Sequence, residues 1–69
     1  MHKLYTHIWK KGDSYEAEGE SADTLDEAID VLNDYAYAWH NRGYEYHCTY
    51  EDDLRDDSVN KLDLSENIT

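Results

Sequence analysis

The chain has 69 residues and a formal net charge of −11, from 17 Asp and Glu against 6 Lys and Arg. A chain of this length forms one domain at most, with a small core. The charge argues against direct binding to nucleic acid or to an anionic membrane, because both depend on Lys and Arg.

Acidity alone is also typical of disordered chains, but those are poor in aromatic residues. Seven Tyr, two Trp and the absence of Pro favour a packed core. The one cysteine, Cys48, can form no internal disulfide, and no apolar run at the N-terminus resembles a signal peptide. We therefore expect a cytoplasmic protein.

The first twenty residues predict a β-hairpin. Residues 3–9 are apolar on both faces, which suits a central strand. Its two faces would carry Leu4, Thr6 and Ile8 on one side and Tyr5, His7 and Trp9 on the other. After a turn at Lys11-Gly12-Asp13, residues 14–20 alternate and predict a half-exposed strand. Its outer face would be acidic, with Glu16, Glu18 and Glu20.

Residues 24–42 predict a helix. Thr24 with Glu27 three residues later forms a capping box, with Asp23 as an alternative cap. Gly43 is well placed to end the helix. Apolar residues recur at helical spacing and would face the core; they are Leu25, Ala28, Ile29, Leu32, Ala36 and Trp39.

Residues 44–50 predict a third strand. One face would carry Tyr44, Tyr46, Cys48 and Tyr50, and the other Glu45, His47 and Thr49. Residues 58–69 could form a short helix, a fourth strand or a docked tail, and the pattern does not choose among the three.

The element order is β-β-α-β. A right-handed crossover would place the third strand beside the first. We therefore expect an α+β fold with a three-stranded antiparallel sheet of order 2-1-3 and one helix packed on one face. The opposite face would carry part of the Tyr and Trp set, as an exposed patch or an interface.

The acids fall into three groups that could bind a basic partner. The first lines one side of the helix with neighbours about 5–6 Å apart, a spacing close to that of backbone phosphates; it holds Asp23, Asp26, Glu27, Asp30 and Asp34. The second is the strand row Glu16, Glu18 and Glu20. The third is the run Glu51, Asp52, Asp53, Asp56 and Asp57. The plain alternative is a solvated surface that keeps the protein soluble.

No motif predicts catalysis or a cofactor. Residues 51–57 lack the spacing and central Gly of a calcium loop. Cys48 and the histidines His2, His7, His40 and His47 include no CxxC or HxxxH pair that would indicate zinc. Cys48 with a histidine is the one nucleophile–base pair worth naming, and a Cys on a Tyr-rich strand face is usually inert packing. We expect neither an enzyme nor a metal site.

In size, in its aromatic β-β-α-β pattern and in the acids of residues 13–34 and 51–57, the chain resembles the small acidic inhibitors made by bacteriophages, of the anti-CRISPR and DNA-mimic antirestriction types. The resemblance covers the whole chain and includes no diagnostic motif. It implies a non-catalytic protein that blocks a basic, nucleic-acid-binding surface of a host protein in the host cytoplasm. The alternative is a homodimeric or accessory module that associates through the Tyr- and Trp-rich face of the sheet.

Overall fold

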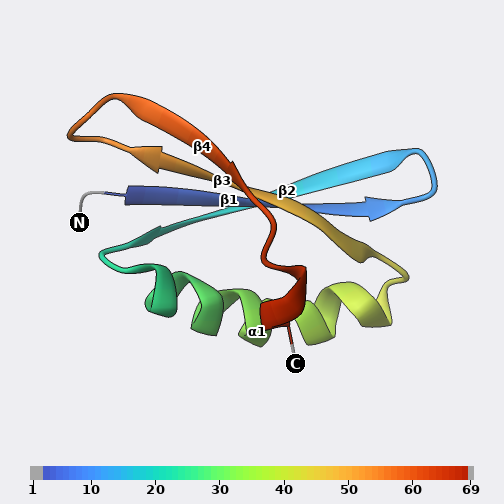
Figure 1. Cartoon of the computed structure of the whole chain (residues 1–69). Helices are drawn as coiled ribbons and strands as arrows, with labels where there is room; N and C mark the ends of the chain where they lie inside the picture. The colour runs from blue at the N-terminus through green and yellow to red at the C-terminus, as the bar shows by residue number, and fades with distance from the viewer. Residues whose placement is uncertain (1–2, 69) are drawn as a thin grey trace.

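An antiparallel sheet forms one layer of the molecule and an α-helix forms the other (Figure 1). The computed structural model describes residues 3–68. The strands are β1 (Lys3–Lys11), β2 (Ser14–Ala22), β3 (Glu45–Asp53) and β4 (Ser58–Leu62), and the helix is α1 (Leu25–Asn41). The α+β class and the single covering helix are confirmed within this range, but the sheet has four strands in the order β2-β1-β3-β4. The expectation of three strands is therefore wrong.

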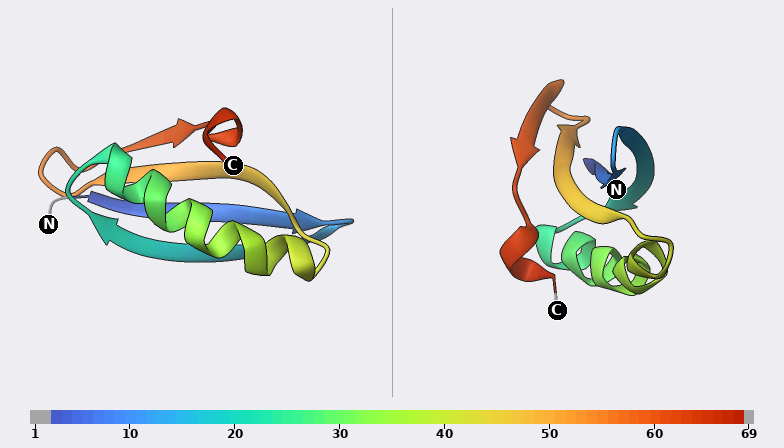
Figure 2. Two further views of the ribbon diagram at one scale, coloured as in Figure 1. Left: turned by 90° about the horizontal axis from the view of Figure 1, so that it is seen from below. Right: turned by 90° about the vertical axis from the view of Figure 1, so that its right-hand side faces the viewer.

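The fourth strand comes from the segment that the sequence left open. β4 pairs with β3 from Thr49 opposite Leu62 to Asp53 opposite Ser58, and so extends the sheet. The chain then folds back over the helix side, where Leu64 is buried and a short 3₁₀-helix, η1 (Ser65–Asn67), follows. The segment is thus both a strand and a docked tail, and Figure 2 shows η1 beside α1. Thr69 lies outside the described residues.

Local signals set both ends of the helix. The Thr24 hydroxyl accepts a hydrogen bond from the Glu27 amide at 3.2 Å, as the capping box predicts. At the other end Gly43 has φ +88°, and the amides of Gly43 and Tyr44 donate to the carbonyls of His40 and Trp39. These two bonds form a Schellman motif, in which the glycine avoids the strain of the left-handed region.

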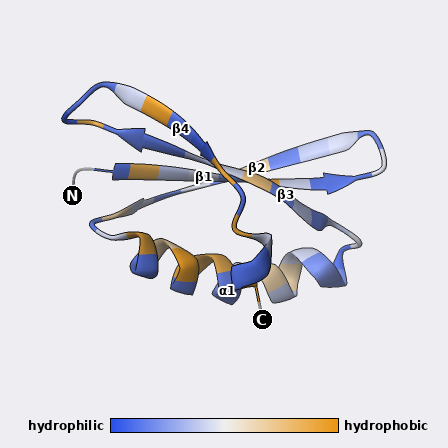
Figure 3. Ribbon diagram, viewed as in Figure 1, coloured by the Kyte–Doolittle hydropathy of each residue, from blue (hydrophilic) through white to orange (hydrophobic). Residues whose placement is uncertain are grey.

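The helix packs on the sheet through small and aliphatic residues, and hydrophobic and hydrophilic segments alternate along it (Figure 3). Trp9, Leu32, Ala36 and Leu64 form one buried cluster, and Tyr5, Ala22 and Ala28 form a second. Trp9 is fully buried and stacks on Trp39, with ring centroids 5.8 Å apart. The core therefore lies between the sheet and α1, on the face of β1 that carries Tyr5, His7 and Trp9.

A β-bulge in β3 changes which residues face the helix. Ile8 of β1 pairs with Cys48, but the next residue, Trp9, pairs with Tyr46, so that His47 is the extra residue. Tyr46 and Thr49 consequently lie on the helix side, whereas Cys48 lies on the other side. The expectation that Tyr44, Tyr46, Cys48 and Tyr50 share one face is wrong after residue 46, because an uninterrupted alternation contains no bulge.

Candidate functional site

The five acids of the helix row lie where the sequence places them. Asp23, Asp26, Glu27, Asp30 and Asp34 are all exposed. With about 100° between successive helical residues, Asp30 and Asp34 project roughly opposite to the buried Ala28, Leu32 and Ala36. Tyr37, one turn after Asp34, continues the row with 76% of its surface exposed. The outer face of α1 is therefore an acidic row that ends in an exposed aromatic ring.

The strand row lies on the side of the sheet that faces the helix, whereas the helix row faces away from the sheet. Glu16, Glu18 and Glu20 pair with Trp9, His7 and Tyr5, and cross-strand partners share a face. The three glutamates thus lie on the helix side of the sheet, and the expected acidic outer face of this strand is wrong. Glu16, near the hairpin turn, is exposed, but Glu18 and Glu20 are partly covered. They are not available as a second open row.

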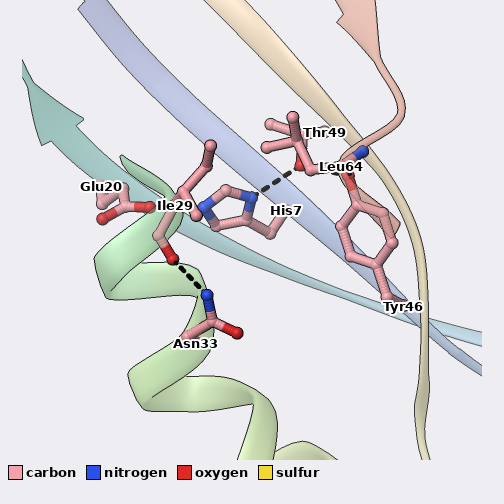
Figure 4. A network of polar contacts seen from close by, with 7 residues as sticks. All are labelled: His7, Glu20, Ile29, Asn33, Tyr46, Thr49 and Leu64. Carbon is pink, nitrogen blue, oxygen red and sulfur yellow. Dashed lines mark hydrogen bonds and ion pairs between the residues drawn. The ribbon is translucent and has the colours of Figure 1, made fainter. Parts of the chain in front are cut away.

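Glu20 belongs to a polar network buried between the sheet and the helix (Figure 4). The His7 ring, which is fully buried, contacts Glu20 Oε1 through Nε2 and lies 2.7 Å from Thr49 Oγ1 through Nδ1. Thr49 Oγ1 lies 2.6 Å from the Tyr46 hydroxyl, and that hydroxyl accepts a hydrogen bond from the Leu64 amide at 3.1 Å. The network links β2, β1, β3 and the tail.

Burial shifts the protonation of this network. Loss of solvent raises the pKa of Glu20 to about 7, because the charged carboxylate is penalised. Burial also lowers the pKa of His7, although the charge of Glu18 opposes that change. For Glu18 burial raises the pKa, and a hydrogen bond from Trp39 opposes the shift. A neutral imidazole that donates through Nε2–H to Glu20 and accepts from the Thr49 hydroxyl satisfies both ring nitrogens.

Three buried polar atoms have no hydrogen-bond partner among the described residues: Trp9 Nε1, Glu18 Oε1 and Glu20 Oε2. An unpaired buried polar atom costs stability. The layer between sheet and helix is therefore less well satisfied than an apolar core. Because His7 is fully buried, its imidazole has no open route to a substrate.

The acids of residues 51–57 take part mostly in local structure. Glu51 accepts a hydrogen bond from the Tyr5 hydroxyl at 2.8 Å and lies 3.6 Å from the Lys3 ammonium. Asp53 Oδ1 accepts from the amides of Arg55 and Asp56, which shapes the turn between β3 and β4. Asp56 and Asp57 are exposed at this turn. Asp52, which pairs with Leu4, lies on the sheet face away from the helix.

The residues considered and rejected as zinc ligands are scattered. Cys48 is buried on the sheet face away from the helix, His47 packs edge-on against Tyr15, and His40 packs edge-on against Trp9. His2 lies outside the described residues. Within residues 3–68, no group of three or more His, Cys, Asp and Glu is arranged to hold a metal ion.

Sequence reasoning missed the network of His7, Glu20, Thr49 and Tyr46. The available signal was His7 itself, which alternates with Tyr5 and Trp9 on one strand face and so had to be buried with them. A buried imidazole needs polar partners. The identity of those partners depends on the bulge and on the orientation of β2, which the sequence pattern does not reveal.

No family model matches the chain, and neither the curated proteins nor the solved structures include a detectable relative. In the described part of the chain, no helix combines the length and the apolar character needed to cross a membrane.

Proposed function

We propose that the protein is a non-catalytic ligand of a basic, nucleic-acid-binding surface on another protein, which it blocks through the outer face of α1. The observation that carries this proposal is the row of exposed acids from Asp23 to Asp34 on a helix whose opposite side is fixed to a sheet. A rigid array of carboxylates presents charge at a constant spacing and loses little conformational freedom on binding.

The helix row suits this role better than the other acids do. Glu18 and Glu20 are partly covered by the helix, and Glu51 and Asp53 are engaged in local contacts. The first-turn acids Asp26 and Glu27 are tolerated near the helix N-terminus, where the dipole favours negative charge. Asp30 and Asp34 lie beyond the reach of that effect, so their mutual repulsion costs stability unless a cationic surface accepts them.

The partner that fits is a cytoplasmic protein with an Arg- and Lys-rich channel for DNA or guide RNA, as in a restriction enzyme or a CRISPR complex. Neighbouring acids about 5–6 Å apart along the helix approximate the separation of phosphates on a nucleic-acid strand. Tyr37 at the end of the row could stack on an Arg side chain of such a surface. A phage-encoded inhibitor would have this mode of action, and its binding would weaken steeply with salt.

The test is competitive capture by the immobilised protein from a nuclease-treated bacterial lysate, with elution by a salt gradient and then by duplex DNA. We expect DNA-binding proteins to be retained at low salt and displaced by DNA. The double substitution Asp30→Lys and Asp34→Lys should abolish their retention.

A matched control carries the same change in net charge elsewhere. Asp13→Lys with Glu66→Lys alters two exposed acids that lie outside the helix row, and this variant should keep most of the retention. Retention that does not respond to salt, or that both double variants lose equally, would refute binding through the helix row.

A further inference from the structure

The tail, residues 63–68, is anchored to the hydroxyl group at one end of the buried network (Figure 4). The Leu64 amide donates to the Tyr46 hydroxyl at 3.1 Å, and the Leu64 side chain is buried in the cluster that holds Trp9. Asn33 of α1 adds a second bond to the tail, from its Nδ2 to the Asn67 carbonyl at 3.0 Å. The state of the Tyr46 hydroxyl therefore bears directly on how the tail is held.

Each hydroxyl in the network has one proton to donate, so the directions of the hydrogen bonds depend on one another. Thr49 Oγ1 and the Tyr46 hydroxyl lie 2.6 Å apart, and either can be the donor. The choice is set by His7 Nδ1, which lies 2.7 Å from Thr49 Oγ1. If Nδ1 carries no proton, Thr49 donates to it and accepts from Tyr46. If Nδ1 carries a proton, it donates to Thr49, and Thr49 donates to Tyr46.

The contact between His7 and Glu20 decides whether Nδ1 carries a proton. With an ionised carboxylate and a neutral ring, the ring proton lies on Nε2 and is donated to Glu20 Oε1, so Nδ1 is bare. An added proton lies between Oε1 and Nε2, because on Glu20 Oε2, which has no partner among the described residues, it would be a buried donor without an acceptor. Whichever of the two atoms holds the added proton, Nδ1 then carries the other ring proton. Uptake of one proton thus reverses the bonds of Thr49 and Tyr46.

Other ionisable groups surround the His7–Glu20 pair. Burial lowers the pKa of His7 and raises the pKa of Glu20 to about 7, so the pair takes up a single shared proton near neutral pH. The acids of α1 are exposed, and Glu18 of β2 adds negative charge close to His7. The remaining groups in this layer are Tyr5 from β1, Glu51, Asp53 and Cys48 from β3, His40 from α1 and Asp63 from the tail. Most of these charges are negative, and negative charge favours the protonated pair.

The two arrangements differ in what they leave for the Tyr46 hydroxyl. With the pair deprotonated, this hydroxyl donates to Thr49 and accepts from Leu64. With the pair protonated, it accepts from both, and its own proton meets no acceptor among the described residues. Water could accept that proton if the tail moved away.

We propose that the tail is a latch controlled by one proton, closed when the His7–Glu20 pair is deprotonated and loosened when the pair takes up a proton. Loosening would uncover Trp9 and Leu32, against which Leu64 packs. The latch goes beyond the proposed function, because it involves no basic partner and no residue of the helix row. Either proposal can fail without the other.

The experiment is NMR spectroscopy of the full chain between about pH 8 and about pH 5. The ¹⁵N resonance of His7 Nδ1 should change from that of an unprotonated ring nitrogen to that of a protonated one as the pH falls. Over the same range, the protection of the Leu64 amide against hydrogen exchange, corrected for the intrinsic rate, should fall roughly tenfold, the weight of one hydrogen bond.

Two matched variants test the path between the pair and the tail. Thr49→Val removes the linking hydroxyl with little change of shape, so Leu64 protection should no longer depend on pH although the His7 ring still titrates. Thr49→Ser keeps a hydroxyl and should keep the dependence. Thr6→Val makes the same change in β1 at a position that faces away from His7, and it should behave as the parent does.

Three results would each overturn the latch. The first is a His7 Nδ1 that keeps one protonation state over the whole pH range. The second is Leu64 protection that is equal at both ends of the range in the parent protein. The third is a loss of the pH dependence in Thr6→Val as large as that in Thr49→Val. Should Thr49→Val fail to fold, the parent and Thr49→Ser still decide the question.

Discussion

The substitution Glu20→Gln examines the buried network directly. Gln has nearly the same shape as Glu and can still pair with His7 Nε2, but it cannot ionise. Burial raises the pKa of Glu20 from 4.5 to about 7. Because the pKa in the folded protein exceeds that of the unfolded chain, the folded state holds the Glu20 proton more tightly.

The sign and size of the effect follow from this difference. The stability contributed by the protonated carboxyl is fully present below pH 4.5 and is lost as the pH rises to about 7. One pKa unit corresponds to about 1.4 kcal/mol, so the ionised carboxylate costs the folded state at most about 3.5 kcal/mol. The Glu20 side chain is 10% exposed at the edge of the sheet, and this partial screening reduces the expected cost to about 1–2 kcal/mol.

The assay is urea unfolding of both proteins at about pH 5 and about pH 8, which lie on either side of the transition. Fluorescence of the stacked Trp9 and Trp39 reports the loss of the core. We expect Glu20→Gln to be more stable than the parent by about 1–2 kcal/mol at the higher pH, with the difference shrinking toward zero at the lower pH. The lowered pKa of His7 acts in the opposite direction, since stability is lost as the pH falls below 6.5, but His7 is present in both proteins.

Glu16→Gln is the control, because Glu16 lies on the same strand face but is exposed. It should show no such dependence on pH. If the stability difference for Glu20→Gln is the same at both pH values, or is larger at the lower one, the buried carboxylate is not the source of the penalty.

Three further substitutions test the fold by urea unfolding. Leu32→Ala removes a fully buried side chain at the centre of α1 and should cost about 2–5 kcal/mol, whereas Leu25→Ala at an exposed position should cost under about 1.5 kcal/mol; equal losses would argue against the observed packing. Gly43→Ala places a Cβ at φ +88°, 3.2 Å from the Lys11 side chain, and should cost about 1–2 kcal/mol. Gly19→Ala, which meets nothing within 4 Å, should be nearly neutral, and a similar cost at both glycines would contradict the assigned backbone. Thr24→Ala should cost about 1 kcal/mol through loss of the helix cap, and a loss near zero would show that the cap bond contributes nothing.

The helix was predictable because its signals are local. Thr24 and Gly43 each act on backbone groups within a few residues, and the spacing of Ala28, Leu32 and Ala36 depends on the helix alone. The prediction of an exposed acidic row on α1 is confirmed for the same reason, since residues opposite the buried stripe face solvent. Its use in binding stays a prediction.

The orientation of β2 was not predictable from its own pattern. Alternation divides the strand into two sets, and the set with Tyr15, Ala17 and Gly19 is the less polar one, so the pattern alone favours that set for the core. In the structure the glutamate set faces α1 instead, because the pairing with β1 brings Glu20 to His7 and because Trp39 supplies a donor for Glu18. These partners are remote in sequence, and no local rule includes them.

The sequence pattern could not single out β4 for a related reason. Its residues, from Ser58 to Leu62, are too polar to indicate a buried face, and the strand forms because the edge of β3 offers unpaired backbone groups. Closure of the turn at residues 54–57 depends on Asp53, whose carboxylate binds two amides, and on Asp57 at φ +54°. Asp is among the few residues that tolerate this conformation, so the composition of the turn was a usable sign of a hairpin.

The bulge at His47 means that β3 contains one residue more than its pairing with β1 requires. Deleting His47 would close the bulge and leave the pairs on either side of it intact, so Tyr46 and Thr49 would still face the helix and Cys48 and Tyr50 the other side of the sheet. Thr49 would therefore keep its contact with the imidazole of His7. An insertion in the turn at residues 54–57 would likewise leave the faces of β3 unchanged. We therefore expect the protein to tolerate changes of length at the tip of that hairpin and the loss of the one unpaired residue in the strand that leads into it.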